Sequence, residues 1–240
     1  MEIVVAQGSE TRGVYNIVNH ADTPAHVKVD VEDWFKTRLG IKGIPVEQWI
    51  KVEPMEFDME PKSTKQAEYV ITPPSDQEGE LAAMVYFGTT SPEGSFSITS
   101  RFGVSIYAAI ENTIKLECSI KDLSVARNVR DPKTETSLLD KGLIFGVMVE
   151  NSGNVHIRPT GNIEIVGENG DKYELKVERG FPVYQGKSLG YSVIWDKKDI
   201  APGKYEVSVT LDCGKIYKMD KKIEKKAVLV VRKNGTVSFQ

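Results

Sequence analysis

Apolar and polar residues alternate along most of this chain with a period of two. Residues 27–32 read VKVDVE, and residues 205–211 read YEVSVTL. This period, combined with β-branched and aromatic residues, predicts half-buried strands. Turn sequences such as Asn169-Gly170 and Pro202-Gly203 separate the strands. The stretch 34–49 lacks the alternation, and we interpret it as a long connection with room for a helical turn.

Three landmarks occur twice along the chain, in the same order. The first is an apolar strand that ends in Asn, turns and resumes, as VYNIVNHADTPAHVKV and as FGVMVENSGNVHIRP. The second is a Pro or Gly turn before a strand, and the third is a Gly turn before a long alternating strand. Two unrelated sandwiches can share such patterns, but the common order favours one sandwich used twice.

The chain has 240 residues, which suits two sandwiches of about 110–120 residues each. We therefore predict an all-β chain of two tandem immunoglobulin-like β-sandwich domains, residues 1–111 and 112–240. No Gly/Ser-rich spacer separates them. In the second domain, residues 199–205 (DIAPGKY) match a tyrosine corner, in which Tyr205 bonds to upstream backbone.

Composition narrows the classes of function. The net charge is -3 and the pI is about 5.8, which argues against a nucleic-acid partner held through phosphate contacts. No stretch approaches the roughly 20 apolar residues of a membrane-spanning helix. The first residues, MEIVVAQGSETRG, lack the features of a signal peptide. The protein is therefore either cytoplasmic or has lost a leader, and the predicted fold favours the second.

No catalytic or metal-binding arrangement is apparent in the sequence. The three histidines, His20, His26 and His156, have no metal-ligand spacing with one another or with the cysteines. Nucleophile elbows, phosphate loops and calcium loops are absent. We therefore expect no enzymatic activity, no cofactor and no metal.

Cys118 and Cys213 are the only cysteines, and both lie in the second predicted domain. Alternation places each thiol toward the interior. Two interpretations remain open: a disulfide formed in an oxidising compartment, or two buried free thiols that act as small apolar groups.

The first predicted domain resembles the periplasmic pilus-assembly chaperone family (PapD-like), most clearly over residues 10–110. The sequences that carry the resemblance are VEPMEFDMEPKSTKQAEYVITPP, EGELAAMVYFGTT and ITSRFGVSIYAAI. They are similar to the family's order of strands, a Pro-x-Ser/Gly turn and a long seventh strand. The second domain matches only as a generic sandwich.

The resemblance implies that the seventh strand offers alternating apolar side chains to a partner by β-strand addition. The corresponding residues here are Phe96, Ile98, Phe102, Val104 and Ile106, with Arg101 between them. Alternating apolar residues more commonly face the core of their own domain. Whether this strand is core or donated therefore stays open at the level of sequence.

The family also holds the partner's terminal carboxylate with an Arg on the first strand and a Lys on the seventh. Gly103 stands at the Lys position of this chain. Arg101, on the same face, and Arg12, near the start, are the candidates for a carboxylate clamp, although a solvated charge is the ordinary interpretation of each.

Two functions follow as hypotheses. The first is a non-enzymatic, chaperone-like or surface-assembly module that captures an extended strand or peptide of a pilus or cell-surface subunit. The second is an extracellular structural or adhesion scaffold that binds protein or polysaccharide through loops. Both place the protein in the periplasm or outside the cell, and the sequence leaves its oligomeric state undetermined.

Overall fold

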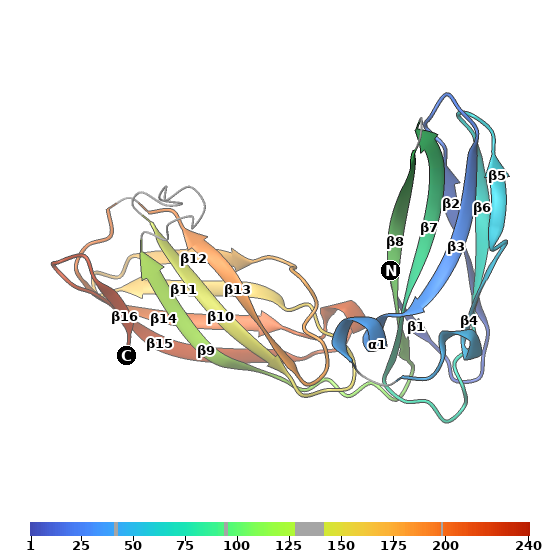
Figure 1. Ribbon diagram of the computed structural model, residues 1–240. Coiled ribbons are helices and arrows are strands. Elements are labelled where there is room, and N and C mark those ends of the chain that lie inside the picture. Colours follow the sequence, from blue (N-terminus) through green and yellow to red (C-terminus); the bar gives the residue numbers. More distant parts are fainter. Residues whose placement is uncertain (41–42, 94–95, 128–141, 198) are drawn as a thin grey trace. The chain divides into compact units, whose positions relative to one another are not determined.

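The computed structural model describes residues 1–240 except 41–42, 94–95, 128–141 and 198, and it describes no side chain in 91–98. The chain divides into two compact units, Met1–Ile114 and Lys115–Gln240, which Figure 1 shows in blue to green and in green to red. The sequence placed this division after residue 111. In the described part of the chain, no helix is long and apolar enough to span a membrane.

Unit 1 consists of two facing sheets (Figure 1). The larger sheet has the order β1 (Glu2–Val5), β8 (Phe96–Ile110), β7 (Glu80–Glu93), β3 (Ala25–Asp33) and β5 (Glu56–Met59). The smaller sheet has the order β2 (Thr11–Val18), β6 (Thr64–Ile71) and β4 (Ile50–Glu53). The inward residues of both sheets form one core, which includes Val29, Ile71, Val85 and Ile106.

The poorly patterned stretch before Trp49 forms a helical turn and a loop. Helix α1 (Trp34–Leu39) begins at Asp33, whose side chain accepts a hydrogen bond from the backbone N–H of Lys36. It ends at Gly40, which adopts the left-handed conformation with φ 67°. A short 3₁₀ helix, η1 (Val46–Gln48), follows before β4. The sequence expectation of a connection with a helical turn is confirmed.

Unit 2 is a second sandwich of two sheets. One sheet has the order β13 (Lys187–Trp195), β10 (Leu143–Asn151) and β9 (Cys118–Arg127). The other has the order β12 (Lys172–Val177), β11 (Thr160–Gly167), β14 (Gly203–Asp212), β15 (Lys222–Val231) and β16 (Val237–Phe239). A 3₁₀ helix, η2 (Lys215–Tyr217), follows β14. The all-β fold of two sandwiches is confirmed.

The internal repeat is visible in the hydrogen bonds of two equivalent asparagines. The side-chain amide of Asn19 donates to Thr23 O and Glu60 O, at 2.9 and 3.0 Å, and that of Asn151 donates to Val155 O and Val183 O, both at 2.8 Å. Each amide oxygen also accepts from the backbone N–H two residues ahead. Both side chains are buried. The same turn therefore follows an equivalent strand in each unit.

The predicted tyrosine corner is confirmed in unit 2. The hydroxyl of Tyr205 donates to Ala201 O at 2.8 Å. Its ring meets the buried Trp195 edge to face, with 5.9 Å between ring centroids. Both rings are therefore buried in unit 2, with the Tyr205 hydroxyl satisfied by backbone.

Candidate functional site: the open edge of β8

Strand β8 has a neighbour along its whole length on one side only. Antiparallel pairing with β7 runs from Phe96 to Ala109. On the other side β1 pairs in parallel and covers only Tyr107–Ile110. Within the described residues no strand pairs with this side before Tyr107, so the first half of β8 is a sheet edge.

Hydrogen bonds near the end of β8 show which backbone groups face this open edge. Tyr107 N donates to Met1 O at 2.9 Å and Glu111 N donates to Val5 O at 2.8 Å, both toward the β1 side. Ile110 N donates to Gly79 O, on the β7 side. Because backbone groups alternate along a strand, the N–H and C=O groups of Arg101 and Gly103 point out of the sheet edge. They are available to an added strand.

The apolar side chains of β8 change from buried to exposed along the strand. Ile106 is fully buried, Val104 is half-buried against the core, and the side chain of Phe102 is 71% exposed. All three lie on the core-facing side of the larger sheet. Ile106 is therefore a core residue, in line with the common case in which alternating apolar residues face the core of their own domain. Phe102, in contrast, projects at the open edge. The side chains of Phe96 and Ile98 lie outside the described residues.

An aromatic cluster lies beside Phe102 in the interior. Phe87, the cross-strand neighbour of Phe102, contacts Tyr15 edge to face at 5.3 Å between centroids. Tyr15 also lies 5.1 Å from Tyr69. The Tyr15 hydroxyl is buried and has no hydrogen-bond partner among the described residues, and this burial raises its pKa well above the usual range. Sequence reasoning did not assign Tyr15 to the site, although alternation on β2 places it inward beside Ile17.

Arg101 is engaged on the outer face of the larger sheet. Its guanidinium bonds Asp30 at 3.3 Å and Glu32 at 3.1 Å, and lies 4.0 Å from the centre of the Tyr86 ring. Tyr86 packs across Gly103, where an added Cβ would come within 2.9 Å of the Tyr86 ring. A side chain at this position would therefore displace the Tyr86 ring, and the stack links β8 to β3 across β7.

Arg12 and Arg101, the two candidates for a carboxylate clamp, are each paired with carboxylates of their own unit. Arg12 is exposed on β2 and bonds Glu10 at 2.7 Å and Glu68 at 3.0 Å, and hydrogen bonds to these two carboxylates raise its pKa. The two arginines belong to different sheets and both face outward, on opposite sides of the sandwich. Each is already paired with two carboxylates, so we do not assign them a shared carboxylate ligand.

The remaining candidates lie away from this edge. Cys118 and Cys213 form a disulfide in unit 2 and close a loop of 95 residues. The described residues include no group of three or more His, Cys, Asp or Glu side chains that could hold a metal ion.

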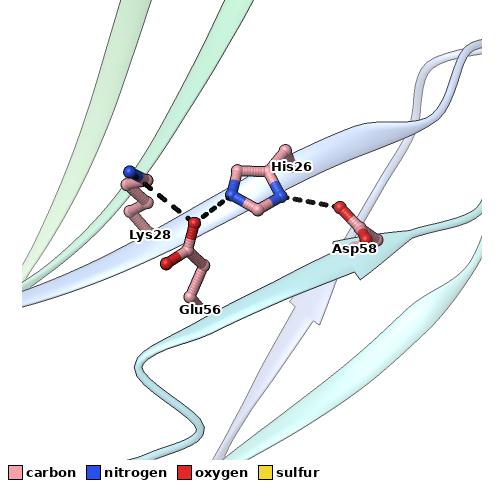
Figure 2. A network of polar contacts seen from close by, with 4 residues as sticks. All are labelled: His26, Lys28, Glu56 and Asp58. Carbon is pink, nitrogen blue, oxygen red and sulfur yellow. Dashed lines mark hydrogen bonds and ion pairs between the residues drawn. The ribbon is translucent and has the colours of Figure 1, made fainter.

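His26 bridges two carboxylates on the outer face of unit 1, as Figure 2 shows. Its Nδ1 lies 2.6 Å from Asp58 Oδ1, and its Nε2 lies 2.6 Å from Glu56 Oε1. Lys28 Nζ approaches the same Glu56 oxygen at 3.6 Å. These contacts tie the edge strand β5 to β3. Hydrogen bonds to Asp58 and then Glu56 raise the pKa of His26.

We expect this network to make the stability of unit 1 depend on pH near neutrality. Because the folded-state pKa of His26 is raised, its contribution is fully present below the unfolded value of about 6.5 and is lost as pH rises through the folded value. Urea unfolding from about pH 5 to 9 measures this change, and it should be absent from His26→Gln. Equal pH dependence in the two proteins would contradict the assignment.

No protein-family model matches this chain, and no curated protein matches it. Among solved structures, the class 5 fimbriae chaperone CfaA is 15% identical, with a TM-score of 0.49 and coverage of 94% of this chain and 95% of that chain. The CupB2 chaperone of Pseudomonas aeruginosa is 14% identical, with a TM-score of 0.43 and coverage of 93% and 96%. The CsuC–CsuE chaperone–subunit complex of Acinetobacter baumannii matches at 10% identity and a TM-score of 0.45, over 92% and 93%. The chain is thus similar, along nearly its whole length and at low sequence identity, to chaperones of fimbriae and pili.

Proposed function

We propose that this protein is a non-enzymatic, chaperone-like binding module of the periplasm that captures an extended strand of a protein partner along the open edge of β8. One observation carries the proposal. The first half of β8 combines outward-pointing backbone groups with an exposed apolar side chain, Phe102, on the core-facing side of the sheet.

Strand addition uses both features of this edge. An incoming strand gains affinity from hydrogen bonds to the backbone of Arg101 and Gly103, and it selects its sequence through contacts with Phe102 and Val104. An exposed apolar edge otherwise invites aggregation, so a partner that covers it protects both chains. We propose a pilus or cell-surface subunit as the partner, the class implied by the resemblance of the sequence.

The other residues of β8 have supporting roles in this proposal. Ile106 anchors the strand in the core, and Arg101 holds its outer face against β3 through Asp30 and Glu32. The binding surface is then centred on Phe102 and Val104. Phe96 and Ile98 extend it only if their side chains continue the same alternation.

Amide hydrogen exchange tests the proposal at single residues. A partner captured from the envelope fraction, or a synthetic peptide of alternating Val and Thr residues, is added to the protein. We expect new protection at the amides of Arg101 and Gly103, because these point to the open edge. The amides of Phe102 and Val104 face β7 and should change little.

The alternative, a scaffold that binds protein or polysaccharide through loops, predicts a different result. Protection would then appear in loops, and the amides of Arg101 and Gly103 would exchange as in the free protein. That pattern, observed with a partner that binds stoichiometrically, would exclude strand capture at β8.

A further inference from the structure

Charges alternate in sign along the free edge of unit 2. Strand β12 pairs with β11 on one side, and the described residues include no strand paired on its other side. Every second side chain of β12 faces solvent, and Glu178 continues this series just after the strand. The four exposed residues are Lys172, Glu174, Lys176 and Glu178. None of the four forms an ion pair with a described residue, so their charges are available to a partner.

The backbone of β12 is also available at these positions. Gly167 N donates to Asp171 O at 2.9 Å, which shows that the odd-numbered residues bond toward β11. By alternation, the N–H and C=O groups of Lys172, Glu174 and Lys176 point out of the sheet. The positions that carry the unpaired charges are therefore the positions that an added strand would bond.

An open groove lies beside this edge. It has a volume of about 660 Å³ and is lined by residues 174–181 and 189–194, from β12, β13 and the segment between them. Leu175 and Leu189 are half-buried in its wall, and Phe181 is 82% exposed at one end. No described residue forms a hydrogen bond with the outward backbone groups of Lys172, Glu174 or Lys176, so they remain available to another chain.

We propose that two copies of this chain associate through antiparallel pairing of β12 with β12, around a two-fold axis at Leu175. In this register Glu174 stands opposite Lys176 of the second copy, and Lys172 stands opposite its Glu178. Lys172, Glu174 and Lys176 belong to hydrogen-bonded pairs, since their backbone groups point outward. The two five-stranded sheets then join into one continuous sheet.

The charge order selects this register over its neighbours. If the two strands shift so that Glu174 stands opposite Glu174 of the second copy, Lys172 stands opposite its Lys176. Every pair in that register joins like charges. A shift in the other direction places Glu174 opposite Glu178 of the second copy and Lys176 opposite Lys176 of the second copy. Like charges directly opposite each other destabilise a strand pair, so the register centred on Leu175, in which all four charges face opposite ones, is favoured over these two neighbours. A two-fold interface requires this kind of self-complementarity.

The pairing also relieves a repulsion within the chain. Glu174 stands directly opposite Glu164 of β11 in the register of the sheet. A lysine from the second copy on its other side compensates this like-charge contact. Charged residues on an edge strand often prevent pairing, but a row that alternates in sign repels only in the wrong register.

Charge-reversal variants of β12 test the proposed dimer. One double variant, K172E with K176E, makes the edge wholly acidic, and the other, E174K with E178K, makes it wholly basic. Sedimentation velocity over a concentration series should show a dimer for the unmodified chain and at least tenfold weaker association for each variant alone. An equimolar mixture of the two variants should restore the dimer, which a folding defect cannot do.

Three results would overturn the proposal. They are an unmodified chain that stays monomeric at its solubility limit, single variants that dimerise as the unmodified chain does, and a mixture that stays monomeric. Leu175→Cys, which faces its own copy, should cross-link under mild oxidation, whereas Tyr173→Cys should not. Equal cross-linking of the two would exclude this register. Phe102→Asp should leave the dimer unchanged, so failure here is distinct from failure of strand capture.

Discussion

Phe102→Asp is expected to weaken partner capture by about ten- to a hundredfold and to leave the folded state intact. The side chain is 71% exposed in the free protein, so its removal costs little stability. In the complex it would be covered, and covering a side chain of this size contributes about 1.5–3 kcal/mol. A charge at this position would also have to be desolvated. Titration calorimetry with the captured partner measures the loss.

Two further variants separate binding from folding. Val14→Asp changes an exposed apolar residue on the outer face of β2 and should leave the affinity unchanged. Ile106→Ala removes a fully buried side chain, and we expect it to destabilise unit 1 by about 2–5 kcal/mol. If Phe102→Asp unfolds the protein as Ile106→Ala does, Phe102 belongs to the core and strand capture at this edge is wrong.

Loss of the Cys118–Cys213 disulfide is expected to destabilise unit 2 by about 4 kcal/mol, since the bond closes a loop of 95 residues. The stabilisation arises mainly because the cross-link restricts the unfolded chain. Urea unfolding of Cys213→Ser, and of the unmodified protein with a reductant, measures the change. Cys213 is buried, so the serine variant also loses a small apolar contact.

Unit 1 provides the internal control for this prediction. Both cysteines of the chain lie in unit 2, so the unfolding of unit 1 should not respond to the reductant. An unchanged transition of unit 2 in the reductant, with both thiols shown to be free by alkylation, would contradict a stabilising role for the bond.

Local patterns were sufficient to predict the fold class. The period of two places alternate side chains on opposite faces of a strand wherever that strand lies, so the all-β architecture follows from short segments. The Asn that precedes a turn in each half of the sequence likewise indicated that the fold is repeated. Asn19 and Asn151 each bond backbone of their own turn, and this local arrangement recurs whenever its sequence does.

The limits of the sequence are clearest on β8. Alternation correctly placed Phe102, Val104 and Ile106 on one face, but it assigned the same environment to all three. Their exposures differ because β1 and the opposite sheet cover only part of the strand, and these neighbours are distant in sequence. The separation of Arg12 from Arg101 on different sheets has the same origin. The faces of Arg12 and Arg101 follow from local pattern, but whether two faces meet depends on how the sheets stack.

The sequence alone therefore determined that this chain forms two related β-sandwiches, because strand periodicity and turn chemistry act between residues close together in the chain. Only the tertiary structure decided which strands are edges, and hence that β8 and β12 have backbone groups open to another chain. An edge is defined by the absence of a neighbouring strand among the described residues. That neighbour would come from a remote part of the chain, so no local pattern can report it.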